Sequence, residues 1–303
     1  MLLVPALRWI KPKAASRVIR SKQTLEPNIT HMNRIALSAA ILFCAASFVY
    51  VGCKKEDVAD SETTSSQDNS LCEGEFMRVL PTVNKIAIDE AGVHRWGPGG
   101  PTVQSCPMIS VDTASSFPVI LTIDYGATGC TDSVDGKVRK GKMIVTVDRP
   151  WDSIGCVMTV MLDSFYVGAI HFEGTTTITR TAVDQFTMSL PNGHCSKGGT
   201  TPWDIDWKTN KTITWTSGIG NSQQNQVVRI TGTNEGTDRN GQHFTTTITN
   251  PLVRDMSCTW ITSGTVELVP DGKATRTIDF GNGNCDNHGT ITIEGNTFEF
   301  TMQ

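Results

Sequence analysis

The strongest constraint on the fold is an alternation of apolar and polar residues that begins after Cys106 and continues to the C-terminus. Val119, Leu121 and Ile123 share one face of such a run, and Ile120, Thr122 and Asp124 share the other. A period of two residues is typical of half-buried strands, and Asp-Gly or Asn-Gly between such runs is typical of hairpins. The sequence therefore predicts a mainly β protein with antiparallel sheets built from hairpins, arranged as a sandwich or an open-barrel-like sheet.

The expected strands are short runs rich in Thr, Val and Ile, separated by turns such as Pro270-Asp271-Gly272 and Glu294-Gly295-Asn296. They lie at 119–124, 142–147, 157–165, 172–180, 212–215, 227–233, 243–249, 260–268, 275–280, 290–293 and 297–301.

An internal duplication predicts disulfides. Ser105-Cys106 begins a hairpin unit that ends at Gly129-Cys130, and Ser257-Cys258 begins a similar unit that ends at Asn284-Cys285. Opposed residues of a tight hairpin have position numbers with a constant sum, and this sum is the same for Asp271 and Gly272 as for Cys258 and Cys285. We expect a Cys258–Cys285 disulfide, and by analogy a Cys106–Cys130 disulfide. The alternative is that all these cysteines are small buried side chains.

One helix is expected before the strands. Phe76, Val79, Leu80, Val83 and Ala87 recur at helical spacing between Asn69 and Gly92, and Pro81 should kink or split this helix. Residues 92–105 are rich in Gly and Pro and predict a loop. We accordingly divide this part of the chain into a tether at 53–70, a helix and loop at 71–105, and a β domain at 106–303.

The segment before residue 53 is typical of an export signal. Ile35 to Val51 is almost wholly apolar, and Tyr50-Val51-Gly52-Cys53 resembles a bacterial lipobox, which implies that Cys53 carries the lipid after cleavage. Residues 32–52 would then be a lipoprotein signal peptide, and residues 1–31 an upstream extension. The alternatives are an uncleaved membrane helix or, for residues 1–31, a targeting extension.

Charge and cysteine content fit an exported chain. From Cys53 onward there are 19 Lys and Arg against 29 Asp and Glu, a net charge of −10, so we expect no nucleic acid partner. Residues 54–70 are almost entirely polar and predict a disordered tether. Seven cysteines follow Cys53, so at least one is free or pairs between chains.

Catalytic signatures are weak. The sequence lacks the common nucleophile, phosphate-loop and zinc motifs, and His194 beside Cys195 does not by itself predict a Cys/His dyad. Asp132, Asp135 and Gly136 form an acidic turn, but two carboxylates are too few for calcium. We therefore expect no metal and no cofactor.

Two features suggest ligand contact. Trp203, Ile205 and Trp207 share one strand face, and Trp215 follows after a turn near Asn210. Exposed Trp rings could stack on sugars, whereas buried ones would be core. Rows of threonines at Thr175, Thr177 and Thr179, and at Thr245, Thr247 and Thr249, could meet a glycan or a partner strand, or simply face solvent.

The lipobox, the acidic tether and the block Thr-Ile-Asp-Phe-Gly-Asn-Gly-Asn-Cys-Asp-Asn at 277–287 resemble a group of uncharacterised lipoproteins of Gram-negative bacteria. The resemblance covers 53–303 and implies a β-rich domain anchored by lipid to the bacterial outer membrane, with no activity to transfer. Three functions stay open: a non-catalytic domain that binds a glycan or protein ligand, a structural or adhesive module that pairs through exposed strands, and a glycoside hydrolase with two carboxylates.

Overall fold

The computed structural model describes residues 60–83, 106–112, 117–132, 135–219 and 226–302. All of them belong to one compact unit, Val58–Gln303. The predicted signal segment and the proposed lipid attachment at Cys53 lie outside the described residues. No helix among the described residues is long and apolar enough to span a bilayer.

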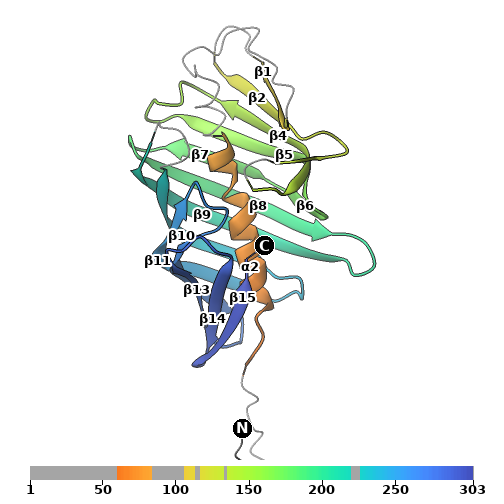
Figure 1. Ribbon diagram of the computed structural model, residues 1–303, viewed down its shortest axis with the longest axis vertical. Coiled ribbons are helices and arrows are strands. Elements are labelled where there is room, and N and C mark those ends of the chain that lie inside the picture. Colours follow the sequence, from red (N-terminus) through yellow and green to blue (C-terminus); the bar gives the residue numbers. More distant parts are fainter. Residues whose placement is uncertain (1–59, 84–105, 113–116, 133–134, 220–225, 303) are drawn as a thin grey trace, which may run out of the picture. The chain divides into compact units, whose positions relative to one another are not determined.

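The described residues form a 15-stranded antiparallel sheet preceded by a short helix, which confirms the predicted fold class (Figure 1). The helix is α2 (Thr64–Phe76). The strands are β1 (Met108–Asp112), β2 (Val119–Asp124), β3 (Cys130–Thr131), β4 (Val138–Val147), β5 (Val157–Val167), β6 (Ile170–Glu173), β7 (Thr175–Arg180), β8 (Gln185–Lys197), β9 (Trp203–Ser217), β10 (Val227–Thr237), β11 (His243–Asp255), β12 (Ser263–Pro270), β13 (Arg276–Asn282), β14 (His288–Ile293) and β15 (Asn296–Thr301).

The strands follow one another across the sheet almost in chain order, from β1 at one end to β15 at the other. β6 and β7 together fill one position between β5 and β8, because each pairs with both of these neighbours. Gly174 interrupts the strand between them, and its φ of 139° favours glycine. The run 172–180, expected as one strand, is therefore two.

Several strand predictions need correction. β8 was not expected, although its inward positions are apolar. The turn expected near Asn210 does not exist, because β9 continues through it and pairs with β8 and β10 along its length. The tertiary pairing of a central strand overrides the local turn preference of Asn and Lys. Trp260 lies before β12, which begins at Ser263.

The structure has two disulfides, Cys106–Cys130 and Cys258–Cys285, at the positions that the duplication predicts. In the first unit β1 pairs with β2, and in the second β12 pairs with β13. Each disulfide joins the segment before the hairpin to the segment after it. Cys72, Cys156 and Cys195 are buried free thiols.

Helix α2 lies across one face of the sheet, which we call the inner face (Figure 1). Alternate strand residues point to this face and are buried, whereas those between them point to the opposite, outer face. The helix begins at Thr64, so the prediction of a disordered tether through residue 70 was wrong for residues 64–70. The predicted split of the helical region occurs at Met77 and Arg78, after which helical residues resume at 79–83.

The C-terminal end of α2 packs through aromatic rings. Phe76 stacks on Trp207 of β9 with 5.5 Å between ring centroids and meets the edge of Phe172 of β6 at 5.6 Å. Gly193 of β8 leaves room for this contact, because a Cβ there would come within 3.2 Å of the Phe76 ring. These rings join α2 to the continuous apolar core of the inner face.

The middle of α2 is polar and yet buried. Lys211 Nζ of β9 donates to Glu73 Oε2 at 3.0 Å, and neither side chain has solvent-exposed surface. Asn234 of β10 donates to the same Glu73 oxygen at 2.8 Å and to Asn69 Oδ1 at 2.9 Å. The indole nitrogen of Trp207 also donates to Asn69 Oδ1. Buried polar groups are costly without partners, so this network fixes α2 in one register over β9 and β10.

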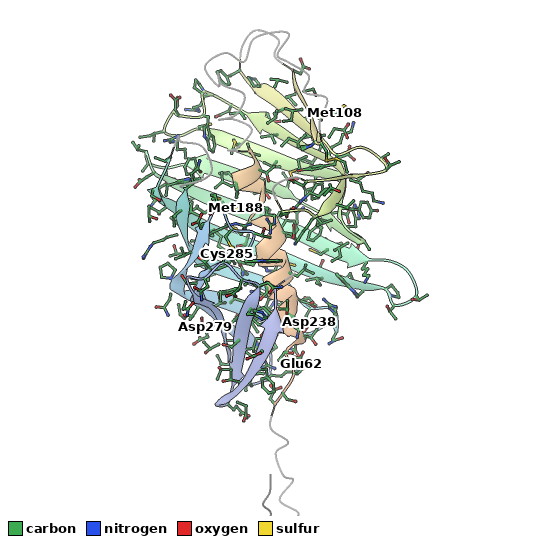
Figure 2. The ribbon with its side chains drawn as sticks, in the orientation of Figure 1. Glu62, Met108, Met188, Asp238, Asp279 and Cys285 are labelled. Carbon is green, nitrogen blue, oxygen red and sulfur yellow. A yellow bond between two sulfur atoms is a disulfide. The ribbon has the colours of Figure 1, made fainter. Side chains whose placement is uncertain are left out.

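The two ends of α2 are also held by charge. Near its N-terminus, Arg239 pairs with Asp68, and Ser65 donates to Asp238. Figure 2 shows Asp238 beside this end of the helix. Near its C-terminus, Glu75 contacts Arg139 of β4.

The acidic turn at Asp132 and Asp135 belongs to the charged contacts at the C-terminal end of α2. Arg139 bonds both oxygens of Asp135 at 2.7 and 2.8 Å, and Arg78 lies 3.1 Å from the same carboxylate. Burial alone would raise the pKa of Asp135, but the hydrogen bonds and charge of Arg139 and Arg78 lower it to about 2. Asp132 also lies 3.3 Å from Arg139.

We predict that Lys211→Met lowers the free energy of unfolding by about 3–5 kcal/mol, because Glu73 would remain buried without its cation. Urea denaturation measures this loss. The matched control is Lys208→Met on the same strand, whose exposed partner Glu235 makes the expected loss about 1 kcal/mol or less. Equal losses in the two variants would contradict the role given to the buried pair.

Candidate functional site

The outer face carries a cavity of about 450 Å³ over β8, β9, β10 and β11. We call it the outer cavity. Most of its lining residues have polar side chains, although the surface that they present to the cavity is more apolar than polar. They are Pro191, Asn192, Gly193, His194, Asp206, Trp207, Lys208, Glu235, Gly236, Thr237 and His243.

Strand alternation places the polar side chains of the outer cavity on the outer face. His194 is the cross-strand partner of Asp206, and Lys208 is the partner of Glu235. Their neighbours along each strand point to the inner face, where Cys195 and Trp207 are buried. Residues on adjacent strands thus meet over a span of four strands, which no short sequence motif encodes.

Two chains of charged contacts line the outer cavity. In the first, His194 Nδ1 lies 2.8 Å from Asp206 Oδ1. In the second, Glu235 Oε1 accepts from Lys208 Nζ at 2.7 Å and lies 3.3 Å from His243 Nε2. The other ring nitrogen of His243, Nδ1, lies 3.1 Å from Asp271 Oδ2.

These contacts shift two pKa values in opposite directions. Hydrogen bonds from Lys208 and then from His243 lower the pKa of Glu235, which favours its carboxylate form. The hydrogen bond to Glu235 raises the pKa of His243 and, with Asp271, outweighs its slight desolvation. The outer cavity therefore presents a stable carboxylate beside an imidazole that is more easily protonated than usual.

Beneath these side chains, Trp207 of β9 has one glycine opposite it on each neighbouring strand. Gly193 and Gly236 are both its direct partners. A Cβ on Gly236 would come within 2.5 Å of the Asp206 carbonyl oxygen, and one on Gly193 within 2.7 Å of the Trp207 carbonyl oxygen. Only glycine lets the strands approach this closely.

The three tryptophans singled out from the sequence do not form one open surface. Trp207 and Trp215 are 1% and 4% exposed. Trp207 borders the outer cavity, but its indole bonds Asn69 on the inner face. Trp215 donates to Gln226. Trp203 is half-buried beneath the guanidinium of Arg239, which lies 4.4 Å from its ring centroid. Trp207 and Trp215 are therefore core residues, which was the alternative to stacking on sugars, whereas Trp203 is only partly buried against the core.

The other sequence candidates separate as well. His194 and Cys195 point to opposite faces of β8, so their side chains do not meet. Thr177 and Thr179, with Thr187 and Thr212, line a second depression on the outer face. Among the described residues, no three His, Cys, Asp or Glu side chains are grouped as a metal site requires.

The sequence analysis missed most of the outer cavity. In the sequence, Asp206 is one of two aspartates, with Asp204, on the strand face opposite Trp207, and Lys208, Glu235 and His243 belong to no recognisable motif. The available signal was weak: each is a polar residue at an outward position of a strand, which is also the ordinary pattern of a solvated sheet face.

We predict that Glu235→Gln lowers the pKa of His243 toward the ordinary histidine value, because a neutral amide stabilises the imidazolium less than a carboxylate does. NMR titration of the His243 ring protons measures the shift. The raised pKa also means that this contact stabilises the fold at acidic pH and that the contribution is lost as pH rises through the folded-state pKa. Glu267→Gln, an exposed outer-face carboxylate on β12, is the control and should leave the titration unchanged. The same titration in both variants would contradict the prediction.

Comparison with known proteins identifies no relative of this chain. No protein-family model, curated protein or solved structure matches the chain significantly. The functional interpretation therefore depends on the residues of this chain alone.

Proposed function

We propose that this protein is an exported domain, anchored by a lipid on Cys53 to the bacterial outer membrane, that binds a ligand without catalysing a reaction. The outer cavity is the observation that carries the binding role. Its volume of about 450 Å³ lies within the usual range of small-molecule sites. The two disulfides support an oxidising compartment, because such bonds are rare in the cytosol.

A hydroxyl-rich ligand such as a glycan suits the lining of the outer cavity. Asp206 and Glu235 are acceptors, Lys208 is a donor, and Asn192 offers both kinds of group. A sugar hydroxyl also donates and accepts, so it can satisfy a mixed lining of this kind. A single short sugar unit fits the volume, and a protein loop that presents polar side chains is the other ligand compatible with it.

The same contacts argue against the glycoside hydrolase alternative. Such an enzyme needs one carboxyl group held protonated beside a second carboxylate. In the outer cavity Lys208 and His243 lower the pKa of Glu235, and Asp206 is already paired with His194. Asp68 does have a raised pKa because it is buried, but it belongs to α2, where it pairs with Arg239, and does not line the outer cavity.

The adhesive alternative depends on the end of the sheet at β1. Among the described strands, β1 pairs only with β2, which leaves its other backbone edge available to a partner strand. Met108 at the start of β1 is 53% exposed. Strand addition at this edge is the second candidate function.

The anchoring prediction concerns Cys53. When the full chain is produced in a Gram-negative bacterium fed a labelled fatty acid, we expect the wild type to take up label and Cys53→Ala to take up none. Cys44→Ala is the matched control and should be labelled like the wild type. Label on Cys53→Ala would contradict the anchor.

The binding prediction concerns the outer cavity. In a glycan screen of the purified full chain in detergent, we expect a sugar ligand whose affinity falls roughly tenfold or more in Glu235→Gln, since a hydrogen bond to a charged group contributes about 1.5–3 kcal/mol. Glu267→Gln should bind like the wild type. Equal loss in both variants, or no sugar bound, would contradict a glycan site and favour the pairing of exposed strands.

A further inference from the structure

Two free thiols meet beneath α2. Cys72 of the helix and Cys195 of β8 are both fully buried, and their Sγ atoms are 3.4 Å apart. The residues are separated by 123 positions in the chain, so this contact joins two elements that are brought together only by the fold. The third free cysteine, Cys156, is buried near Arg149 and makes no such contact.

We propose that Cys72 and Cys195 form a third disulfide bond, which fixes α2 covalently to the sheet. The two sulfurs need to approach by less than 2 Å to reach the bonding distance of about 2 Å. The contact described here, in which one thiol donates to the other, would be the reduced form of that bond. With the two hairpin disulfides, this assignment pairs six of the seven cysteines after Cys53 and leaves Cys156 as the free one.

The reaction requires an oxidant, and a small disulfide or an oxidised dithiol protein supplies it. The thiolate of one cysteine attacks a sulfur of this oxidant, forms a mixed disulfide and releases the other sulfur as a thiol. The second cysteine of the pair then attacks the sulfur of the first cysteine in the mixed disulfide. This step forms the Cys72–Cys195 bond and releases the remaining sulfur of the oxidant as a thiol. Two electrons and two protons pass from the cysteine pair to the oxidant, which ends as two thiols.

The burial of the pair determines when this reaction occurs. Neither sulfur is accessible once α2 is docked, and burial together with Cys195 raises the pKa of the Cys72 thiol. A raised pKa leaves little thiolate to attack the oxidant. The bond therefore forms while the chain folds, before α2 covers the inner face. The same burial then protects it from reductants.

The bond would complement the polar contacts of α2. Glu73, next to Cys72, is held by Lys211 and Asn234 on neighbouring strands. A covalent link at Cys72 holds this part of the helix over the sheet even when those ionic contacts weaken. Closing a long loop of chain also restricts the unfolded state, which adds to stability.

Non-reducing peptide mapping of the full chain tests the proposal. Trypsin places Cys72, Cys156 and Cys195 on three separate peptides, 56–78, 143–180 and 181–197. Protein from bacterial envelopes is denatured in an alkylating agent, so that free thiols are capped before digestion. We expect peptide 56–78 joined to 181–197, with peptide 143–180 alkylated. Recovery of 56–78 and 181–197 as separate alkylated peptides would overturn the proposal, whether or not the hairpin disulfides are present.

A second measurement tests the effect on the helix. Because the buried bond resists reductant in the folded protein, the wild type is reduced in urea and refolded with reductant present. This treatment should speed hydrogen exchange of the α2 amides roughly tenfold or more, while Cys72→Ser should exchange fast with or without it. Cys156→Ser is the control and should respond like the wild type. If wild-type α2 exchanges at the same rate with and without reductant, the bond does not fix the helix.

Discussion

The ion pair between Glu73 of α2 and Lys211 of β9 is the interaction on which the rest of the structure depends. It has no exposed side-chain surface, so neither charge can be satisfied by water if the helix shifts. A buried pair of this kind adds little net stability, but it penalises every alternative register. Asn69 and Asn234 extend the same constraint, and Phe76 then adds apolar contact at the position that they fix.

Because the helix is held in this way, it determines which face of the sheet is available to a ligand. The inner face is covered by α2 and filled by its aromatic and ionic contacts, so its side chains serve the fold. The outer face keeps its polar side chains in solvent. The strand that carries Lys211 inward also carries Asp206 and Lys208 outward, so β9 links the support of the helix to the outer cavity.

The fold class could be predicted because strands and hairpins leave local signals, as the alternation around Leu121 and the turn at Asp271-Gly272 do. The position of α2 could not. Its buried residues are mostly Ser, Asp, Asn and Glu, which is also the composition of a solvated tether. The partners Trp207 of Asn69 and Lys211 of Glu73 are each 138 positions away. The inward position of Lys211 could not be predicted for the same reason, since a buried lysine on a strand is explained only by Glu73, which faces it.

The position of α2 also changes how the proposed anchor would act. With residues 64–70 docked, the described chain begins at Asp60, seven positions after Cys53, so these two residues are at most about 25 Å apart. The sheet would then be held closer to the lipid surface than a 17-residue tether allows. A pull on the anchor would first load residues 60–63, where Asp60 pairs with Arg276 and Glu62 with Lys273. It would then reach α2, where ionic contacts and the proposed Cys72–Cys195 bond act in parallel. A covalent bond would hold the helix against such a pull even where the buried ionic contacts give way, which gives the polar helix a reason to carry a cysteine beside Glu73.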